Sequence, residues 1–214
     1  LVVKTFVRKS NVMDREYTYK NLQNLISAHP EMECKVYLVH GDLSDDEMHS
    51  LYRNPTIKAF VSLTHGEGYG LPLFEAAYTG IPVVAPGWSG QCDFLYAPFE
   101  SKNKKNKKEK MRPYFAEVEY TIEPVPQSAI WEGVIQADSM WCYPQEGSYK
   151  MRLRQVYKNY DKWKSKADYL QKWILDNFTN EIQYGKFANA VYQEEKFEIE
   201  DWLNELEKEA VEFD

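Results

Sequence analysis

The sequence predicts an α/β domain built on a doubly wound parallel sheet. Segments typical of strands and of helices alternate four times within the first 86 of its 214 residues. The segment 81–86, IPVVAP, is apolar without alternation, as in strands that are buried on both faces of a parallel sheet. Because parallel strands need a crossover between them, this order favours one sheet with helices on its faces.

The first strand, helix and second strand have simple signals. Residues 1–7, LVVKTFV, form a β-branched run, and residues 14–29 carry apolar side chains at near-helical spacing. Residues 34–41, CKVYLVHG, predict the second strand. These segments form the first strand-helix-strand unit of the predicted sheet.

A second helix and a third strand follow. Ser44 and Glu47 have the spacing of a capping box, so a helix is expected to begin at Ser44 and run past Tyr52. Residues 58–64, KAFVSLT, predict the third strand.

The link from this strand to the next helix is the stretch SLTHGEGYGLPLFE, residues 62–75. Pro72 stands where a first helical residue is expected, and Gly80 is a natural end for the helix. The fourth strand, 81–86, then follows directly.

The second half of the chain changes in character. A basic loop, 100–113, holds six lysines, and it is either a solvated loop or a contact for an anionic surface such as a lipid headgroup or an acidic acceptor. Residues 114–122 predict a fifth strand, and the pattern is helical from Gly147 onward. Residues 191–214 predict an acidic amphipathic helix, whose apolar stripe allows a dimer.

Composition excludes several functions. A formal charge of -7 argues against nucleic-acid binding, which needs a clustered basic surface. Three scattered cysteines indicate neither a disulfide framework nor a zinc site and favour a reducing compartment. No apolar run approaches the roughly 20 residues of a membrane span. We expect a cytoplasmic protein, for which membrane association through the basic loop stays open.

The glycine-rich link carries the chemistry. Ligands of open parallel sheets bind at the carboxyl ends of the strands, where this link lies. Its three glycines free the backbone for close approach, and the following helix start offers unpaired amides and a positive dipole to a diphosphate. Glu67 in the loop and Glu75 in the helix each match vicinal hydroxyls, so one acid can hold a ribose and the other a sugar.

Residues 67–95, EGYGLPLFE followed by AAYTGIPVVAPGWSGQCDFL, resemble the C-terminal donor-binding domain of retaining GT-B glycosyltransferases, the glycosyl transferases group 1 family. That family has a Glu, seven residues, Glu motif, a small-residue helix and a G-x-P-V-V strand. The resemblance is strong over 36–96, moderate over 120–190 and absent from the basic loop and the acidic tail. It implies a Rossmann-like fold with C-terminal helices.

The resemblance also implies a role for each position of the motif. Glu75 would bind the ribose hydroxyls of a nucleotide sugar, and Glu67 would act beside the reacting carbon of the transferred sugar as the catalytic residue. Four consecutive backbone amides would line the sugar and phosphate path, those of Gly68, Tyr69, Gly70 and Leu71.

Two further residues are candidates for donor binding. His65 is close to Glu67 in the sequence and has two interpretations. It contacts the sugar or carries a proton, or it is a loop histidine whose ring hydrogen-bonds to the backbone. Lys4 is the candidate for the diphosphate, although it departs from the family's basic pair. No metal or cofactor is expected, since there is no DxD motif and the acids at 42–47 are explained by a helix dipole.

The resemblance bears on domain organisation as well. GT-B enzymes place their acceptor-binding domain N-terminal to the donor domain, and the chain opens at Leu1 directly on a strand. We therefore expect residues 1–190 to form a donor domain without its first strand, followed by the acidic helix 191–214. Its expected partners are the missing N-terminal domain and a glycan, lipid or protein acceptor, and the chain alone should transfer little sugar.

Other functions are compatible with parts of the sequence. A non-catalytic sugar-nucleotide or protein-binding module would keep the same fold. A glycosidase needs both carboxyl groups in one cleft, about 5 to 9 Å apart, and one acid in a loop with one in a helix disfavours this. The string GWSGQ does not match a serine nucleophile elbow, and the string HGEGYG does not match a dinucleotide-binding fingerprint.

Overall fold

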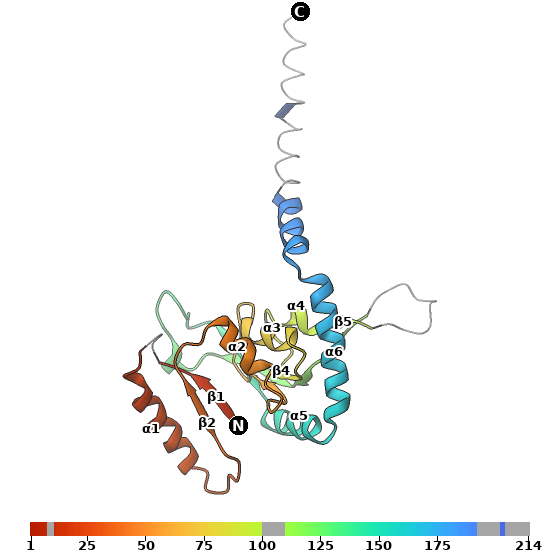
Figure 1. Cartoon of the computed structure of the whole chain (residues 1–214). Helices are drawn as coiled ribbons and strands as arrows, with labels where there is room; N and C mark the ends of the chain where they lie inside the picture. Colours follow the sequence, from red (N-terminus) through yellow and green to blue (C-terminus); the bar gives the residue numbers. More distant parts are fainter. Residues whose placement is uncertain (8–10, 100–109, 192–201, 204–214) are drawn as a thin grey trace, which may run out of the picture. The chain divides into compact units, whose positions relative to one another are not determined.

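The computed structural model describes residues 1–7, 11–99, 110–191 and 202–203 (Figure 1). These residues form a mixed α/β structure with parallel and antiparallel sheets, which agrees with the predicted α/β class. The chain divides into two compact units, Leu1–Asn54 and Pro55–Asp214, here called the N-terminal and C-terminal units. Each unit is described by itself.

The N-terminal unit has a two-stranded parallel sheet, in which Val3 lies opposite Leu38. Ser44 caps its second helix as predicted, because its hydroxyl accepts from the Glu47 amide and the Glu47 carboxylate accepts from the Ser44 amide. That helix ends at Tyr52 rather than beyond it. In chain order the elements are β1 (Val2–Thr5), α1 (Asp14–Ser27), β2 (Tyr37–His40) and α2 (Asp45–Tyr52).

The core of the C-terminal unit is a parallel sheet in the order β3-β4-β7. Its strands are β3 (Phe60–Val61), β4 (Val83–Pro86) and β7 (Ala116–Val118). All four residues of β4 are buried, and successive side chains of a strand point to opposite faces. Both faces of β4 are therefore covered, as the apolar pattern of 81–86 predicts.

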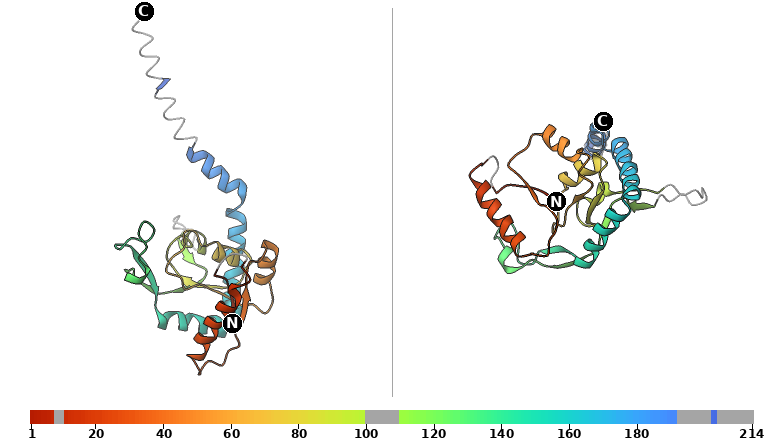
Figure 2. Two further views of the ribbon diagram at one scale, coloured as in Figure 1. Left: turned by 90° about the vertical axis from the view of Figure 1, so that its left-hand side faces the viewer. Right: turned by 60° about the horizontal axis from the view of Figure 1, so that its bottom comes forward.

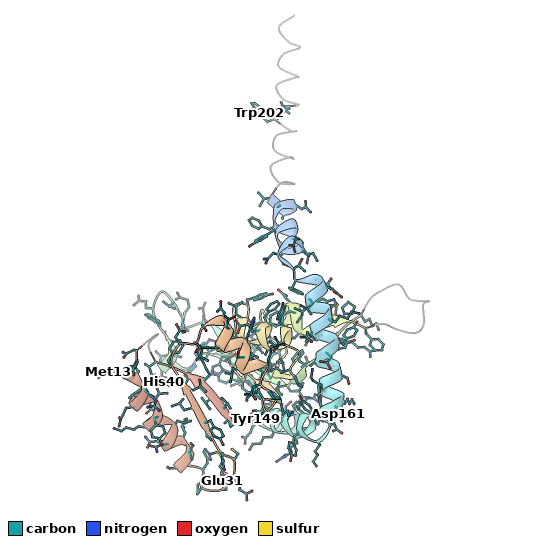
Figure 3. All side chains as sticks on the ribbon, viewed as in Figure 1. Met13, Glu31, His40, Tyr149, Asp161 and Trp202 are labelled. Carbon is teal, nitrogen blue, oxygen red and sulfur yellow. The ribbon has the colours of Figure 1, made fainter. Side chains whose placement is uncertain are left out.

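Helices pack around this sheet. Val156 of α5 joins Val84, Ala116 and Val118 in one buried cluster, with Tyr149 packed against it (Figure 3). Helix α6 contacts α3 and buries an apolar stripe of Ala167, Leu170 and Ile174. The helices of this unit are α3 (Leu71–Tyr78), α4 (Cys92–Leu95), α5 (Glu146–Lys158) and α6 (Tyr160–Asn177). The helical pattern expected from Gly147 onward is thus confirmed, with a break at Asn159.

Two antiparallel hairpins complete the unit. The first pairs β5 (Tyr96–Pro98) with β6 (Met111–Pro113), and the second pairs β8 (Tyr120–Pro124) with β9 (Met140–Pro144). The loop of the second hairpin includes the 3-10 turn η1 (Gln127–Ala129). Figure 2 shows this hairpin extending from the C-terminal unit.

The predicted fifth strand, 114–122, is in fact split between β7 and β8 at Glu119. The backbone of Glu119 bonds to the start of α5 instead of to a strand. Its amide donates to the Ser148 hydroxyl over 2.9 Å, and its carbonyl accepts from the Gln145 amide over 2.8 Å. The chain therefore turns from the parallel sheet into the hairpin at this residue.

The end of the described chain is helical over 180–191, with Tyr184 and Phe187 both about 70% exposed. Trp202, labelled in Figure 3, is also exposed. The predicted acidic helix 191–214 otherwise lies outside the described residues, as do positions 100–109 of the basic loop. Within the described part of the chain, no helix has both the length and the apolar character required to cross a membrane.

Candidate functional site

The candidate site lies in the loop between β3 and α3. Gly70 precedes α3 with a φ of 88°, a left-handed conformation that glycine adopts without strain. Its carbonyl accepts the first helical hydrogen bond, from the Phe74 amide over 2.9 Å. Pro72 lies in the first turn of the helix, and Gly80 follows its end with a φ of 75°. Both helix limits agree with the sequence signals.

A second loop, residues 87–91, holds this loop in place at Glu67. The Glu67 carbonyl accepts from the Ser89 hydroxyl and from the Gly90 amide, the latter over 3.4 Å. Ser89 has a φ of 70°, which is unfavourable for a residue with a Cβ atom. The Glu67 carboxylate accepts from the Thr64 hydroxyl over 3.2 Å. Glu67 is thus oriented through both its backbone and its side chain.

His65 is fixed by the β8–β9 hairpin. Its Nδ1 lies 2.8 Å from the Cys142 carbonyl oxygen, and its own carbonyl accepts from the Cys142 amide. A carbonyl oxygen can only accept, so Nδ1 carries a proton and Nε2 is left for another partner. The imidazole stacks on Trp141 at 4.7 Å and 10°, and contacts Tyr143 at a tilt. Only one ring nitrogen is therefore satisfied by the backbone.

These two loops and the hairpin enclose an open cavity of about 580 Å³. This volume lies within the range typical of small-molecule sites, roughly 300 to 1,000 Å³. Its lining combines a carboxylate, an imidazole, glycine backbone and large apolar side chains. The lining residues are His65, Gly66, Glu67, Gly68, Trp88, Ser89, Met140 and Trp141.

Three of the predicted site residues, His65, Glu67 and Gly68, thus meet at the cavity. Tyr69 and Gly70 lie beside it instead. The Tyr69 ring packs against Phe74 and Phe94, and burial, together with the nearby Asp93 carboxylate, raises the pKa of its phenol.

The remaining predicted residues lie away from the cavity lining. Leu71 is the exposed first residue of α3, and Glu75 is half-buried within the same helix. Lys4 belongs to the N-terminal unit, where it pairs with Val39 on β2 and its Nζ lies 4.7 Å from the centre of the Phe6 ring.

Several residues of the site have no counterpart among the predictions. Trp88, Met140 and Trp141 line the cavity, and the Trp88 ring is supported by Tyr120 at 5.8 Å. Ser89 also lines the cavity, and Gln91, which is 2% exposed, belongs to the same 87–91 loop but lies outside the lining. Trp88 and Gln91 both lie in the string GWSGQ, within the segment 67–95, but the string by itself indicates no binding role for either side chain.

Gln91 has an unusual hydrogen-bonding state. Its amide nitrogen donates to the Pro86 carbonyl over 3.2 Å, which orients the group. Its Oε1 is buried and has no partner within the described residues. A buried acceptor of this kind is normally paired with a water or a ligand donor.

The described residues contain no group of three His, Cys, Asp or Glu side chains placed to hold a metal ion. The acids Asp45, Asp46 and Glu47 form the first turn of α2, where the positive end of the helix dipole stabilises them. Comparisons with known protein families, with curated protein sequences and with solved structures find no match for this chain.

Proposed function

We propose that this chain is the donor-binding part of a retaining glycosyltransferase, which binds a nucleoside-diphosphate sugar and transfers the sugar to a glycan, lipid or protein acceptor. The observation that carries the proposal is the loop 65–70. It places Glu67 at a cavity and leads into α3 through Gly70, at the end of a parallel strand. The acceptor-binding domain would be a separate, N-terminal part of the enzyme.

The proposal includes a doubly wound, Rossmann-like sheet. Supporting it are the two parallel pairings of β4, with β3 and with β7, and the burial of β4 on both faces. The N-terminal unit contains a parallel strand pair of its own, β1 and β2. In such a sheet the ligand lies at the carboxyl ends of the strands, which is where the glycine-rich loop begins.

The diphosphate would bind at the start of α3. The first amides of a helix have no partner within the helix and point along the positive end of its dipole. In this chain the amides of Gly68, Tyr69, Gly70 and Leu71 precede Pro72, which has no N–H, and these four amides would be the donors to phosphate oxygens.

The two acids would hold opposite ends of the donor. Glu67 lies at the cavity and would accept hydrogen bonds from the transferred sugar. Glu75 lies about one turn into α3 and would accept from the ribose. Of the two acids only Glu67 lines the cavity, so the cavity would hold the sugar and not the nucleoside.

The reaction would break the bond between the anomeric carbon and the diphosphate oxygen and form a bond to an acceptor hydroxyl on the same face. The acceptor proton would pass to the departing diphosphate. Charge develops on the leaving phosphate in this step, and the helix start would stabilise it. The Glu67 carboxylate would stabilise the positive charge that develops on the sugar ring.

Two isosteric variants test the proposal in the full-length gene product. Glu75→Gln should weaken nucleotide binding about ten- to hundredfold, as expected for loss of a charged acceptor. Glu67→Gln should reduce turnover more than affinity. Glu132→Gln, an exposed acid of the β8–β9 loop, is the matched control and should behave as wild type.

The measurements are calorimetric titration with UDP, GDP and ADP and with their hexose conjugates, followed by a donor-hydrolysis assay. Binding without turnover would favour a non-catalytic sugar-nucleotide module. If both glutamate variants match the control in affinity and turnover, the assignment is wrong.

A further inference from the structure

We propose that the cavity is a hexopyranose subsite whose wall is formed by Trp88, Met140 and Trp141, and that Trp141 is a positioning residue for His65. This inference rests on the proposed function, because it concerns the sugar end of the donor. It assigns a role to the β8–β9 hairpin, which lies outside the motif that suggests the function.

The wall is apolar and accessible. Trp88 is 36% exposed and Met140 is 47% exposed, although large apolar side chains in a monomer are normally covered where they gather. Both lie in the same cavity as Trp141. Their side chains come from segments more than fifty residues apart, so the folded structure creates this wall. A pyranose has apolar C–H faces that such a surface can cover.

The polar groups of the cavity lining match the hydroxyl groups around the edge of a pyranose ring. The Glu67 carboxylate is an acceptor, the His65 Nε2 is an acceptor when the ring is neutral, and the Trp88 Nε1 proton is a donor. Neither Nε2 nor Nε1 has a hydrogen-bond partner among the described residues. Sugar hydroxyls both donate and accept, so they satisfy all three groups. A hydrocarbon ligand would leave these groups unpaired, at a cost to binding.

Trp141 acts on the sugar partly through His65. Its indole covers one face of the imidazole, and the next residue along the strand supplies the carbonyl that accepts from Nδ1. Stacking and hydrogen bond together fix the ring plane and the tautomer, which sets the direction of Nε2. Loss of the indole would uncover one face of the imidazole and leave the ring held by the Nδ1 hydrogen bond and the tilted contact with Tyr143, so that the direction of Nε2 is less well fixed.

The test compares two ligands across matched variants of the full-length gene product. Trp141→Ala and Met140→Ala should each weaken binding of the preferred hexose conjugate about tenfold, while the affinity for the free nucleoside diphosphate stays unchanged. Trp141→Phe keeps a ring to stack on His65 and should recover most of the loss. Trp131→Ala removes a 65% exposed tryptophan of the same hairpin outside the cavity and is the control.

The outcomes separate this inference from the proposed function. If the hexose conjugate binds and Trp141→Ala and Met140→Ala match Trp131→Ala, the inference is wrong and the proposed function stands. An equal loss for conjugate and free diphosphate also overturns the inference, because a sugar subsite acts only on the conjugate. If wild type binds none of the nucleotides or conjugates, both proposals fail. Met140→Ala removes a half-exposed side chain and should fold, so it remains informative if Trp141→Ala does not.

Discussion

Replacing Gly90 by alanine should destabilise the C-terminal unit, because this glycine lies directly against the site loop. An added Cβ would lie 2.8 Å from the Tyr69 Cα and 2.9 Å from the Gly68 carbonyl carbon. Ordinary contacts between carbon atoms are about 3.5 to 4.0 Å, so relief needs a shift on the order of 1 Å. Both neighbours are backbone atoms, and a rotamer change cannot provide that shift.

The expected loss of folding free energy follows from the contacts that this shift breaks. Overpacking of this kind costs about 1–3 kcal/mol. Separating the loops would also lengthen the hydrogen bonds from Gly90 and Ser89 to the Glu67 carbonyl, each worth about 1 kcal/mol. The shift that relieves the clash is the same shift that breaks these bonds, so the overpacking cost and the hydrogen-bond cost are not additive. We expect the free energy of unfolding to fall by about 2–3 kcal/mol. For a chain of this size that lowers Tm by roughly 4 to 12 °C.

Tryptophan fluorescence during urea unfolding measures this loss selectively. All six tryptophans belong to the C-terminal unit, so the signal reports on that unit. Gly68→Ala is the matched control, because a Cβ there meets no atom within 4 Å and the glycine φ is not in the left-handed region. Its free energy of unfolding should stay within about 0.5 kcal/mol of wild type or rise slightly. A Gly90→Ala variant as stable as this control would refute the close approach of the loops.

Three further predictions concern individual residues. Ser89→Gly should be more stable than Ser89→Ala by about 1 kcal/mol in the same unfolding assay, since both lose the hydroxyl but only glycine relieves the left-handed strain; equal stabilities would contradict this. Ser44→Ala removes a capping box and should cost about 1 kcal/mol, seen as lost helical circular dichroism from α2 on mild heating, and Ser44→Asn should retain it. Burial raises the pKa of the Cys142 thiol to about 11 from the ordinary 9.0, so the folded state keeps this proton longer than the unfolded state. Stability should therefore fall as pH rises from about 9 toward 11. This slope should be shallower in Cys142→Ala, in which the Cys92 thiol, whose pKa burial also raises, remains. At pH 8 an alkylating reagent should modify the exposed Cys34 far faster than Cys142.

The features that could be predicted from the sequence are those decided locally. The capping box at Ser44 depends on side chains three residues apart, and Pro72 and Gly80 limit α3 through their own backbone preferences. The burial of β4 could be predicted because a short run of successive apolar residues without alternation is typical of a strand covered on both faces.

Breaks set by tertiary contacts could not be predicted in the same way. At Glu119 the β-rich pattern of 114–122 continues, yet hydrogen bonds to residues of α5 take the backbone out of the parallel sheet. At Asn159 the apolar spacing likewise continues while the helix direction changes between α5 and α6. Periodicity records which residues are apolar, and it contains no information about such distant partners.

The same distinction applies to the candidate site. His65, Glu67 and Gly68 are neighbours in the sequence, so their common position at the cavity could be predicted. The partner of His65, by contrast, lies 77 residues away at Cys142, and the position of Trp141 follows from the register of the β8–β9 hairpin. Aromatic residues of that hairpin carry no motif spacing, so no local signal could place them beside Glu67.

The glycines of the site divide into two kinds, and the division bears on the proposed ligand. Position 70 requires glycine because its φ is left-handed, and position 90 requires glycine because no space is left for a Cβ atom. The fold itself therefore explains both residues. Gly68 has neither requirement, and open space faces the position where its side chain would be. Stability therefore gives no reason for glycine at 68. Close approach of a ligand would give one, and a Gly68→Ala variant that folds normally but binds nucleotide sugar more weakly would identify the ligand as that reason.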